Sequence, residues 1–493
     1  MMKAFHRMIA LCLAALLLLG AVGCAQDPNE TETTASESNT VGENETVDEA
    51  AEALEALGEM DWGGEDFTVL YVNTLGGYQQ EVEGEPLSEG SKTGLLSNAV
   101  YERNSLFEER CNLKFCTVGK DGAQAQAAVD AEVRAGSSSY QLMNHCLETT
   151  ANMCTTGILY NYRNYNIDYR MPWWDAGTLS FELNGKVFFM SGAQNTVDDD
   201  VTYLMAYNKQ LARDYHIEGL YETVHSGDWT LEYFESVLQG LSTDNGDGKW
   251  DKEDMYGLAS ANNLANSLFY GSDLRYVATD PESGDPVLAM ESDEIEKAVN
   301  VLNVARRLYH ENNTAYVGDD QTFTHAAEIF ADNRAVFFWH DATRFATFNS
   351  LMENDYGVLP PPKYDKQQER YYTWAHGVGS TLSIPETSGG ADGFSNILEA
   401  YVILSHQKIT PVYYDILLKS RSVRDSESVE ILDTLFSNRV YDLPMYFTQF
   451  GLFDIANAVV QSNTDSFVSK YQASAKRFER TLGQILKKLE NQN

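Results

Sequence analysis

The sequence predicts an α/β protein with two lobes, and two observations support this expectation. β-rich runs alternate with helical stretches between residues 67 and 143, which is the pattern of a parallel sheet with right-handed crossover connections. Roughly 430 of the 493 residues lie beyond a predicted signal and linker, more than one hydrophobic core usually supports. We therefore expect two α/β lobes joined by crossing segments.

The first 23 residues have the pattern of a secretory signal. Lys3 and Arg7 precede an apolar run from Met8 to Val22. That run is shorter than the ~20 residues of a membrane-spanning helix, and small residues follow it. We expect residues 1–23 to be removed on export.

Cys24 directly follows these small residues and resembles the lipobox cysteine of bacterial lipoproteins, although leucine is more usual at the position of Ala21. The resemblance implies that Cys24 carries diacylglycerol and acyl chains such as palmitate, and stable anchoring requires more than one chain. An ordinary signal with an incidental cysteine is the alternative. The expected location is the extracytoplasmic face of the cell membrane, in a bacterium of Gram-positive type.

Residues 24–63 are predicted to form a disordered acidic linker. Between Ala25 and Met60 there are eleven acidic residues and no basic residue, so this segment cannot bury enough apolar surface to offset its ordering entropy. Part of it, from Val47 to Leu57, is rich in Ala, Glu and Leu and favours a transient helix. We expect the folded domain to cover residues 64–493.

Three strands and two helices are expected at the start of this domain. The strands are 67–72, 113–118 and 140–143, and the helices are 95–111 and 123–135. In open parallel sheets, ligands bind beyond the carboxyl ends of the strands. A cleft is therefore predicted at residues 73–78, 119–121 and 144–146.

The rest of the domain alternates in the same way. Strands are expected at 187–190, 203–207 and 336–339, and helices at 230–241, 295–309, 397–405 and 429–436. Thr230 is the expected N-cap of its helix. The prolines at 360–362 predict an extended connector. The chain ends in one long amphipathic helix whose apolar stripe runs from Val468 to Leu489.

Composition and motifs exclude several functions. The net charge of −38 argues against binding to nucleic acid, because such a surface repels phosphate. The sequence contains none of the common hydrolase, nucleotide-binding or zinc-protease signatures, so we expect no enzymatic activity. Asp198-Asp199-Asp200 fits either a metal site or, the favoured interpretation, a solvated acidic turn.

The four remaining cysteines of the folded domain lack the spacing of a structural metal site. They are Cys111, Cys116, Cys146 and Cys154. A Cys146–Cys154 disulfide is conceivable in an exported chain, and the sequence does not decide whether the cysteines are reduced.

Residues 243–254 resemble a calcium loop of the EF-hand or dockerin type. Gly248 lies at loop position six, where a sharp turn is required. The candidate ligands are Thr243, Asn245, Asp247, Lys249 (through its carbonyl), Asp251 and Asp254. Thr243 replaces the usual first aspartate, which Asp244 partly compensates, and Asp254 replaces the usual bidentate glutamate. No cofactor is required; the alternatives here are a structural calcium ion and a glycine-rich turn of the same shape.

Six weak motifs in the right order are similar to the extracellular solute-binding proteins of carbohydrate-type ABC transporters (family 1). They lie at 228–234, 254–257, 330–337, 356–363, 383–385 with the helix from Asn396, and 421–440. The resemblance implies a bilobal periplasmic-binding-protein-like fold (type II), with two α/β lobes joined by hinge crossings. It implies lobe one at about 64–200 and 335–375, and lobe two at about 201–334 and 376–493.

The same resemblance implies a lipid-anchored receptor that captures a solute, a sugar or oligosaccharide, for an ABC importer. Its partners would be the solute, the permease subunits and the membrane, and we expect a monomer. The alternatives are a surface glycan-degrading lipoprotein enzyme and a ligand-sensing or adhesion module. The sequence does not identify the ligand.

Candidate ligand-binding residues come from strand ends and crossings rather than from the family. They are Tyr78, His145, Trp339, His340, Asp341, Trp374 and His376. Sugars require flat aromatic faces and planar polar groups within a largely apolar cleft. Each of these side chains also fits a packing role.

Overall fold

The computed structural model describes residues 48–86, 94–260, 263–318, 324–417, 426–490 and 492. The predicted signal, Cys24 and the linker as far as residue 47 lie outside these residues. The prediction of disorder as far as residue 63 is wrong from Asp48 onward. Helix α2 (Glu49–Ala56) packs on α14 (Phe394–Lys408), and Asn396 Nδ2 donates to the carbonyl of Leu57 at 3.2 Å. Its acidic composition predicts disorder, but the alanines and leucines of α2 pack against an apolar face of α14, and this burial orders the segment.

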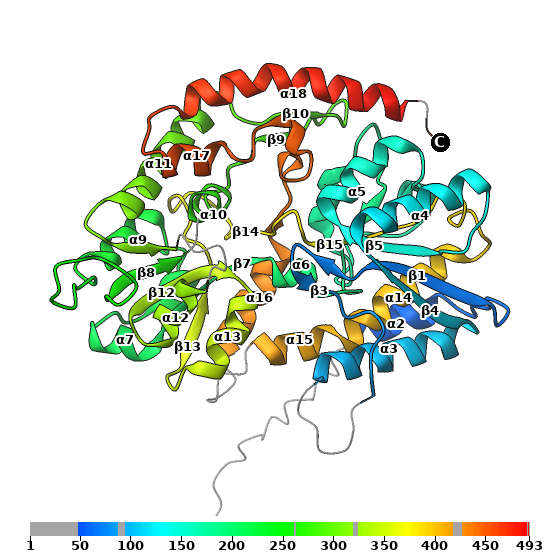
Figure 1. The fold of residues 1–493 in the computed structure, drawn as a ribbon, viewed down its shortest axis with the longest axis horizontal. Helices are drawn as coiled ribbons and strands as arrows, with labels where there is room; N and C mark the ends of the chain where they lie inside the picture. The colour runs from blue at the N-terminus through cyan, green and yellow to red at the C-terminus, as the bar shows by residue number, and fades with distance from the viewer. Residues whose placement is uncertain are drawn as a thin grey trace, which may run out of the picture. The chain divides into compact units, whose positions relative to one another are not determined.

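The described residues form two five-stranded sheets (Figure 1). The order in the first sheet is β4 (Lys114–Lys120), β1 (Asp66–Val72), β5 (Leu142–Cys146), β15 (Ser380–Ser383), β6 (Phe189–Met190). Strands β4, β1 and β5 are parallel, as predicted, whereas β15 runs antiparallel to both β5 and β6. Both faces are covered by helices: α2, α3 (Leu95–Cys111) and α14 on one, α4 (Gly122–Ala135) and α5 (Leu147–Met153) on the other.

The order in the second sheet is β11 (Ala315–Val317), β8 (Tyr256–Ser260), β12 (Ala335–Asp341), β7 (Tyr203–Asn208), β13 (Tyr356–Leu359). Strands β11, β8 and β12 are parallel, and β7 is antiparallel to its neighbours. The surrounding helices are α7 (Lys209–Asp214), α8 (Leu220–His225), α9 (Leu231–Leu238), α10 (Leu264–Gly271), α11 (Ser292–His310), α12 (His325–Ala331), α13 (Thr343–Leu351), α16 (Ser426–Ser437) and α17 (Ile455–Gln461). Thr230 caps α9 as predicted, accepting from the amide of Tyr233 at 3.3 Å.

The predicted division into lobes is wrong for two segments. Residues 335–375 were expected in lobe one, but their strands β12 and β13 belong to the second sheet. Residues 376–493 were expected in lobe two, but β15 and α14 belong to the first sheet. The reason is pairing: β12 pairs with β8 and β7, whereas β15 pairs with β5 and β6.

Three segments connect the two sheets. The first is α6 (Val197–Asp200), between β6 and β7. The second follows β13 and contains β14 (Thr373–Trp374), which pairs in parallel with β16 (Arg439–Val440). The third contains α15 (Thr410–Leu417), which lies between α14 and α16 in the sequence. These crossings place polar side chains between the two sheets.

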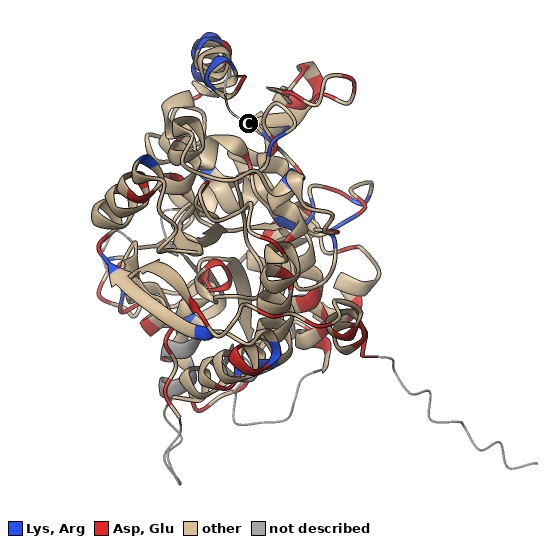
Figure 2. Ribbon diagram, turned by 90° about the vertical axis from the view of Figure 1, so that its right-hand side faces the viewer, with Lys and Arg blue, Asp and Glu red and all other residues tan. Residues whose placement is uncertain are grey.

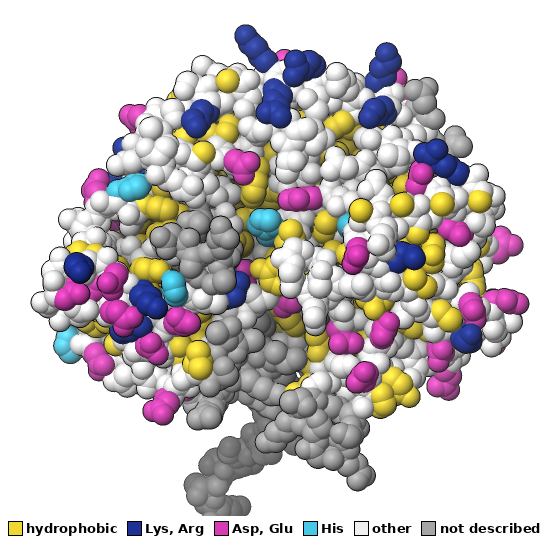
Figure 3. Space-filling view, viewed as in Figure 1, with side chains coloured by type: hydrophobic (Ala, Val, Ile, Leu, Met, Phe, Trp, Pro, Cys, Tyr) yellow, Lys and Arg dark blue, Asp and Glu magenta, His cyan; other side chains and the backbone are white. Residues whose placement is uncertain are grey.

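The C-terminal helix α18 (Phe467–Leu489) packs on α11 and α17 and also on the short helix η1 (Cys154–Thr156). Its apolar stripe is buried as predicted at Tyr471, Phe478 and Leu482, but Val468 is exposed. Basic side chains gather on its outer face, at the top of Figures 2 and 3, on a protein of net charge −38. None of the helices in the described part of the chain has the length and apolar character that a membrane crossing requires.

Candidate functional site

Four of the predicted ligand-binding residues meet at one cavity between the two sheets. Tyr78 comes from β3 (Tyr78–Gln79), which pairs with β2 (Thr74–Leu75) just beyond the end of β1. His340 and Asp341 end β12, and His376 follows β14. The cavity has a volume of about 180 Å³ and is also lined by Gly76, Val201, Tyr203, Asn263 and Val378. We call it the Asp341 cavity.

Asp341 is the electrostatic centre of this cavity. Its carboxylate lies 2.9 Å from Nδ1 of His340 and accepts a hydrogen bond from the hydroxyl of Tyr78 at 3.2 Å. The hydroxyl of Thr343 and the guanidinium of Arg344 contact its other oxygen. Burial acts to raise the pKa of Asp341, but His340, Arg344 and Thr343 outweigh it and hold the pKa at about 2. Asp341 therefore carries a buried negative charge at neutral pH.

Tyr78 joins the two sheets through its hydrogen bond to Asp341. Burial and the neighbouring carboxylate of Asp341 raise the pKa of the Tyr78 hydroxyl well above its ordinary value. The phenol therefore stays protonated and donates. Because Tyr78 follows a strand of the first sheet and Asp341 ends a strand of the second, this bond links the two sheets.

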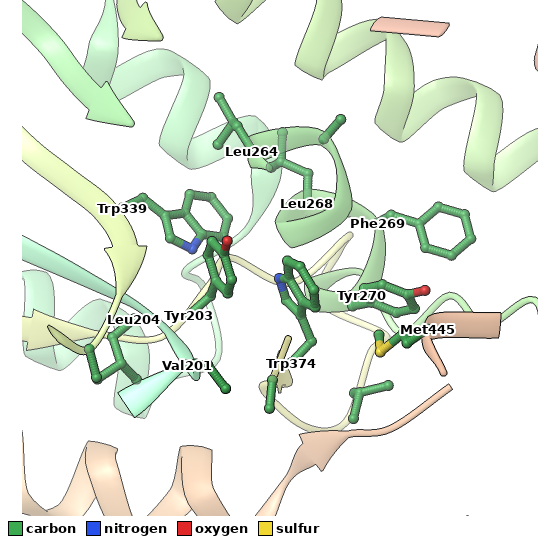
Figure 4. Close-up of a cluster of buried hydrophobic side chains, with 14 of the residues drawn as sticks. Val201, Tyr203, Leu204, Leu264, Leu268, Phe269, Tyr270, Trp339, Trp374 and Met445 are labelled. Carbon is green, nitrogen blue, oxygen red and sulfur yellow. The ribbon is translucent and has the colours of Figure 1, made fainter. Parts of the chain in front are cut away.

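Stacked rings form one wall of the cavity (Figure 4). The ring of Tyr203 lies parallel to that of Trp374, with centroids 4.3 Å apart, and also stacks on His340 at 5.8 Å. The hydroxyl of Tyr203 accepts from Asn263 Nδ2 at 2.7 Å, and Trp374 Nε1 donates to Ser267 Oγ at 3.0 Å. The ring of Tyr203 is thus packed against two protein rings and hydrogen-bonded through its hydroxyl.

The other three predicted residues do not line this cavity. His145 is buried, with Nε2 3.2 Å from the carbonyl of Gly122 and Nδ1 accepting from the amide of Cys146. Trp339 is a buried residue of β12, and its ring contacts that of Phe234. Trp374 is fully buried and supports Tyr203 from behind. Ligand contact by any of the seven residues stays a prediction.

Sequence reasoning missed Tyr203 and Asn263 as cavity residues. The rule that it used considers the carboxyl ends of parallel strands. Tyr203 begins β7, which runs antiparallel to β12, and Asn263 lies just before α10. The sequence does predict a strand at 203–207. Because this strand is antiparallel to β12, its first residue, Tyr203, lies beside Asp341 at the carboxyl end of β12.

The calcium-like loop is closed by its own hydrogen bonds. Both carboxylate oxygens of Asp254 accept backbone amides, from Asn245 at 2.8 Å and from Asp251 at 2.7 Å. Asp244 accepts from the amides of Gly246 and Gly248; its compensation for the missing first aspartate as a ligand stays a prediction. Within the described residues, no group of three or more His, Cys, Asp or Glu side chains is arranged to hold a metal ion. Calcium binding here stays a prediction.

The solvated turn expected at Asp198-Asp199-Asp200 is wrong. Asp198 is only 2 % exposed, and the carboxylate of Asp199 lies 2.9 Å from a guanidinium nitrogen of Arg439. Asp200 accepts from the hydroxyl of Tyr413 at 2.8 Å. The sequence pattern does not reveal this ion pair, because Arg439 is far from Asp199 in the sequence. Cys111, Cys116, Cys146 and Cys154 are all free, so the conceivable Cys146–Cys154 disulfide is not formed.

Solved structures provide the comparison with known proteins, since no protein-family model and no curated protein matches this chain. A maltose-binding protein from Listeria monocytogenes, in complex with maltose, matches with a TM-score of 0.53 at 13% identity, over 85% of this chain and 98% of that one. An ABC substrate-binding protein from the same organism, in complex with cycloalternan, gives 0.51 at 13% identity over 85% and 99%. UgpB from Mycobacterium tuberculosis, in complex with glycerophosphocholine, gives 0.50 at 16% identity over 78% and 95%.

These matches cover most of each chain. Because the sequence identities are low, the matches establish the fold and nothing about the ligand. The predicted fold class is confirmed: the chain has the bilobal α/β fold of ABC-transporter substrate-binding proteins, with the Asp341 cavity between its lobes.

Proposed function

We propose that this protein is a non-catalytic receptor that binds a sugar or oligosaccharide outside the cell and delivers it to the permease subunits of an ABC importer. The observation that carries the proposal is the Asp341 cavity, where a buried ionised carboxylate and several hydroxyl, amide and imidazole groups converge from both lobes. Structurally similar proteins are reported with maltose and with cycloalternan.

The chemistry of the cavity suits a polyol. An ionised carboxylate accepts hydrogen bonds from sugar hydroxyls, and charge-assisted hydrogen bonds are the strong ones. The amide of Asn263 and the imidazole of His376 line the same space. A ligand hydroxyl that replaces the Tyr78 hydroxyl at Asp341 would satisfy the same acceptor, so closure on a ligand exchanges one hydrogen bond for another.

Binding is tested by thermal shift and calorimetry on the full chain with maltose, longer maltodextrins, cycloalternan and, as a non-sugar solute, glycerophosphocholine. A ligand at 100 times its Kd stabilises the folded state by about 2.7 kcal/mol. We expect a glycan to raise Tm and to reduce the radius of gyration measured by small-angle scattering. Absence of any response across sugars would overturn the proposal, and a response to glycerophosphocholine alone would replace the ligand class.

Asp341→Asn provides the site-specific version of this test. Hydrogen bonds to charged groups contribute about 1.5–3 kcal/mol, so the glycan Kd should rise roughly 10- to 100-fold. Asp442→Asn is the matched control, because Asp442 is equally buried but accepts the backbone amides of Tyr276 and Val277. It should lower stability and leave the glycan Kd unchanged.

Membrane attachment belongs to the same proposal. We propose that Cys24 holds the receptor at the extracytoplasmic face and that it acts as a monomer. Cys24→Ala should release the protein from the membrane fraction, and light scattering should give the monomer mass. Incubation with polysaccharide should yield no product; release of sugar would favour the enzyme alternative.

A further inference from the structure

The C-terminal helix α18 contacts both lobes. Figure 1 shows it running from the side of α11 and α17, in the lobe built on the second sheet, to the side of α5, in the lobe built on the first. It packs on α11 and α17 and, at its other end, on η1, which directly follows α5. The three crossings join the lobes through the backbone. By contrast, α18 follows α17 in the sequence and meets the first lobe through noncovalent contacts.

The first half of α18 is fixed to the second lobe. The rings of Phe467 and Tyr471 are buried, and each lies 6.4 Å from a ring of that lobe, Phe269 and Tyr276 respectively. Further along the helix, Ser474 Oγ donates to the carbonyl of Gly451 at 2.8 Å. These contacts and the short connection from α17 hold this end of the helix in place.

The last turn of α18 makes the contact with the first lobe. Leu489 is fully buried, and the ammonium of Lys186 donates to its carbonyl at 3.1 Å and also to the carbonyl of Gln492. Lys186 leads into β6, a strand of the first sheet. The last carbonyls of a helix lack partners within it and attract positive charge, so a lysine suits this position. We call the interaction of Leu489 and Gln492 with Lys186 and η1 the C-terminal contact.

Separation of the lobes would break this contact. Helix α18 has 23 residues, which gives it a length of about 34 Å, and a helix cannot lengthen to follow two lobes that move apart. The Asp341 cavity, at about 180 Å³, is smaller than the ~300 Å³ or more of typical small-molecule sites, so the lobes must separate before a larger solute enters. The end of α18 that has no backbone connection to its lobe is the end that gives way.

We propose that α18 is a strap whose C-terminal contact restrains lobe opening. While the contact is made, the lobes are held at their present spacing. When it breaks, α18 stays on the second lobe and the lobes separate about the three crossings. The inference concerns a motion of the chain itself, so its test uses no glycan and its outcome does not depend on the proposed function.

The experiment measures the radius of gyration of the full chain without ligand by small-angle scattering. Lys186→Met removes the ammonium and keeps a side chain of similar length, and Leu489→Ala removes the buried apolar group. Each should raise the radius of gyration by about 1 Å, roughly 5% of the value for a compact domain of this length. Amide hydrogen exchange in the last turn of α18 should become about tenfold faster in both variants.

Two controls separate the C-terminal contact from other effects. Lys476→Met removes an exposed lysine in the middle of the same helix and should change neither measurement. Phe467→Ala weakens packing on the second lobe and should lower Tm while leaving the radius of gyration unchanged. If Lys186→Met and Leu489→Ala keep the wild-type radius, or if the controls expand the chain as much, α18 does not restrain the lobes and the proposal is overturned.

Discussion

Two groups of buried carboxyl groups lie at or near the short crossing α6, and their surroundings shift the carboxyl pKa in opposite directions. In the Asp341 cavity one carboxylate is contacted by His340, Thr343 and Arg344, and its pKa is held at about 2. Around Arg439, the carboxyl groups of Asp175, Asp198 and Asp199 share one guanidinium, and the pKa of Asp198 is raised. The number of hydrogen-bonding and charged partners for each carboxyl group thus decides whether burial leaves it ionised.

This difference has a consequence for ligands. A matched and ionised carboxylate can accept hydrogen bonds from a neutral polyol without an added ion. A carboxyl group whose pKa is raised keeps its proton and can donate a hydrogen bond as well as accept one. The two groups therefore offer different hydrogen bonds, although both lie between the same two lobes.

The largest expected effect comes from removing the shared counter-charge. Arg439→Met keeps most of the side-chain volume but leaves Asp175, Asp198 and Asp199 buried without a cation. Breaking a buried ion pair on one side costs about 3–5 kcal/mol. Denaturant unfolding should therefore show a loss of that size, whereas Arg439→Lys should lose less. A loss below ~1 kcal/mol for Arg439→Met would mean that the carboxylates are neutral in the folded state.

The next effect is a pH dependence of opposite sign at two carboxyl groups, that of Asp200 at the end of α6 and that of Asp341. Burial raises the pKa of Asp200 from 3.8 to about 7, so the folded state holds a proton that the unfolded state releases. That contribution is fully present below pH 4 and is lost as the pH rises toward 7. The low pKa of Asp341 works the other way: its contribution is present above pH 4 and is lost as the pH falls toward 2.

Asp200→Asn isolates the first of these contributions. Between pH 4.5 and 7.5 the unfolding free energy of the wild type should fall by about 3 kcal/mol more than that of the variant. Burial also raises the pKa of Asp442 to about 7. Asp442→Asn is therefore a second test, and it should reduce the pH dependence of the unfolding free energy in the same way. Identical slopes for the wild type and Asp200→Asn would show that Asp200 is ionised in the folded protein.

Much of the fold followed from local sequence patterns, and the failures have a common cause. Strands β1, β4 and β5 were expected because apolar, β-branched residues alternate there with helices. Strand β15 was not, because three of its four residues, Ser380 to Ser383, are serine or threonine although all are buried. Their hydroxyls are satisfied by distant partners: Ser380 donates to Asp198, and Thr381 to the carbonyl of His145. Composition cannot reveal such long-range pairing, and the division into lobes depended on it.

The candidate site shows the same limit. Tyr78 and Asp341 were found because each lies at or just beyond the carboxyl end of a strand, where a parallel sheet presents its ligand-binding edge. Tyr203 was missed because it enters the cavity from the start of an antiparallel strand. Arg439 was missed because its carboxylate partners lie far away in the sequence, and a single arginine carries no local signal of burial.

The smallest expected effect concerns a third acidic region, the exposed loop at 243–254, where the structure shows backbone amides rather than charges answering the carboxylates of Asp254. These amides stabilise the loop without a cation. A calcium ion would therefore gain its binding energy mainly from the other carboxylate and carbonyl oxygens of the loop. With a Kd near 1 mM, typical of weak extracellular sites, 5 mM calcium would stabilise the fold by about 1 kcal/mol. Tm should accordingly be higher in calcium than in chelator, magnesium should give a smaller rise, and Asp247→Asn should abolish the difference. Equal Tm values in calcium and chelator would mean that the amides alone hold the loop, and the comparison would then extend to three regions: a carboxylate buried with its counter-charge, carboxylates buried in excess of theirs, and carboxylates that need none.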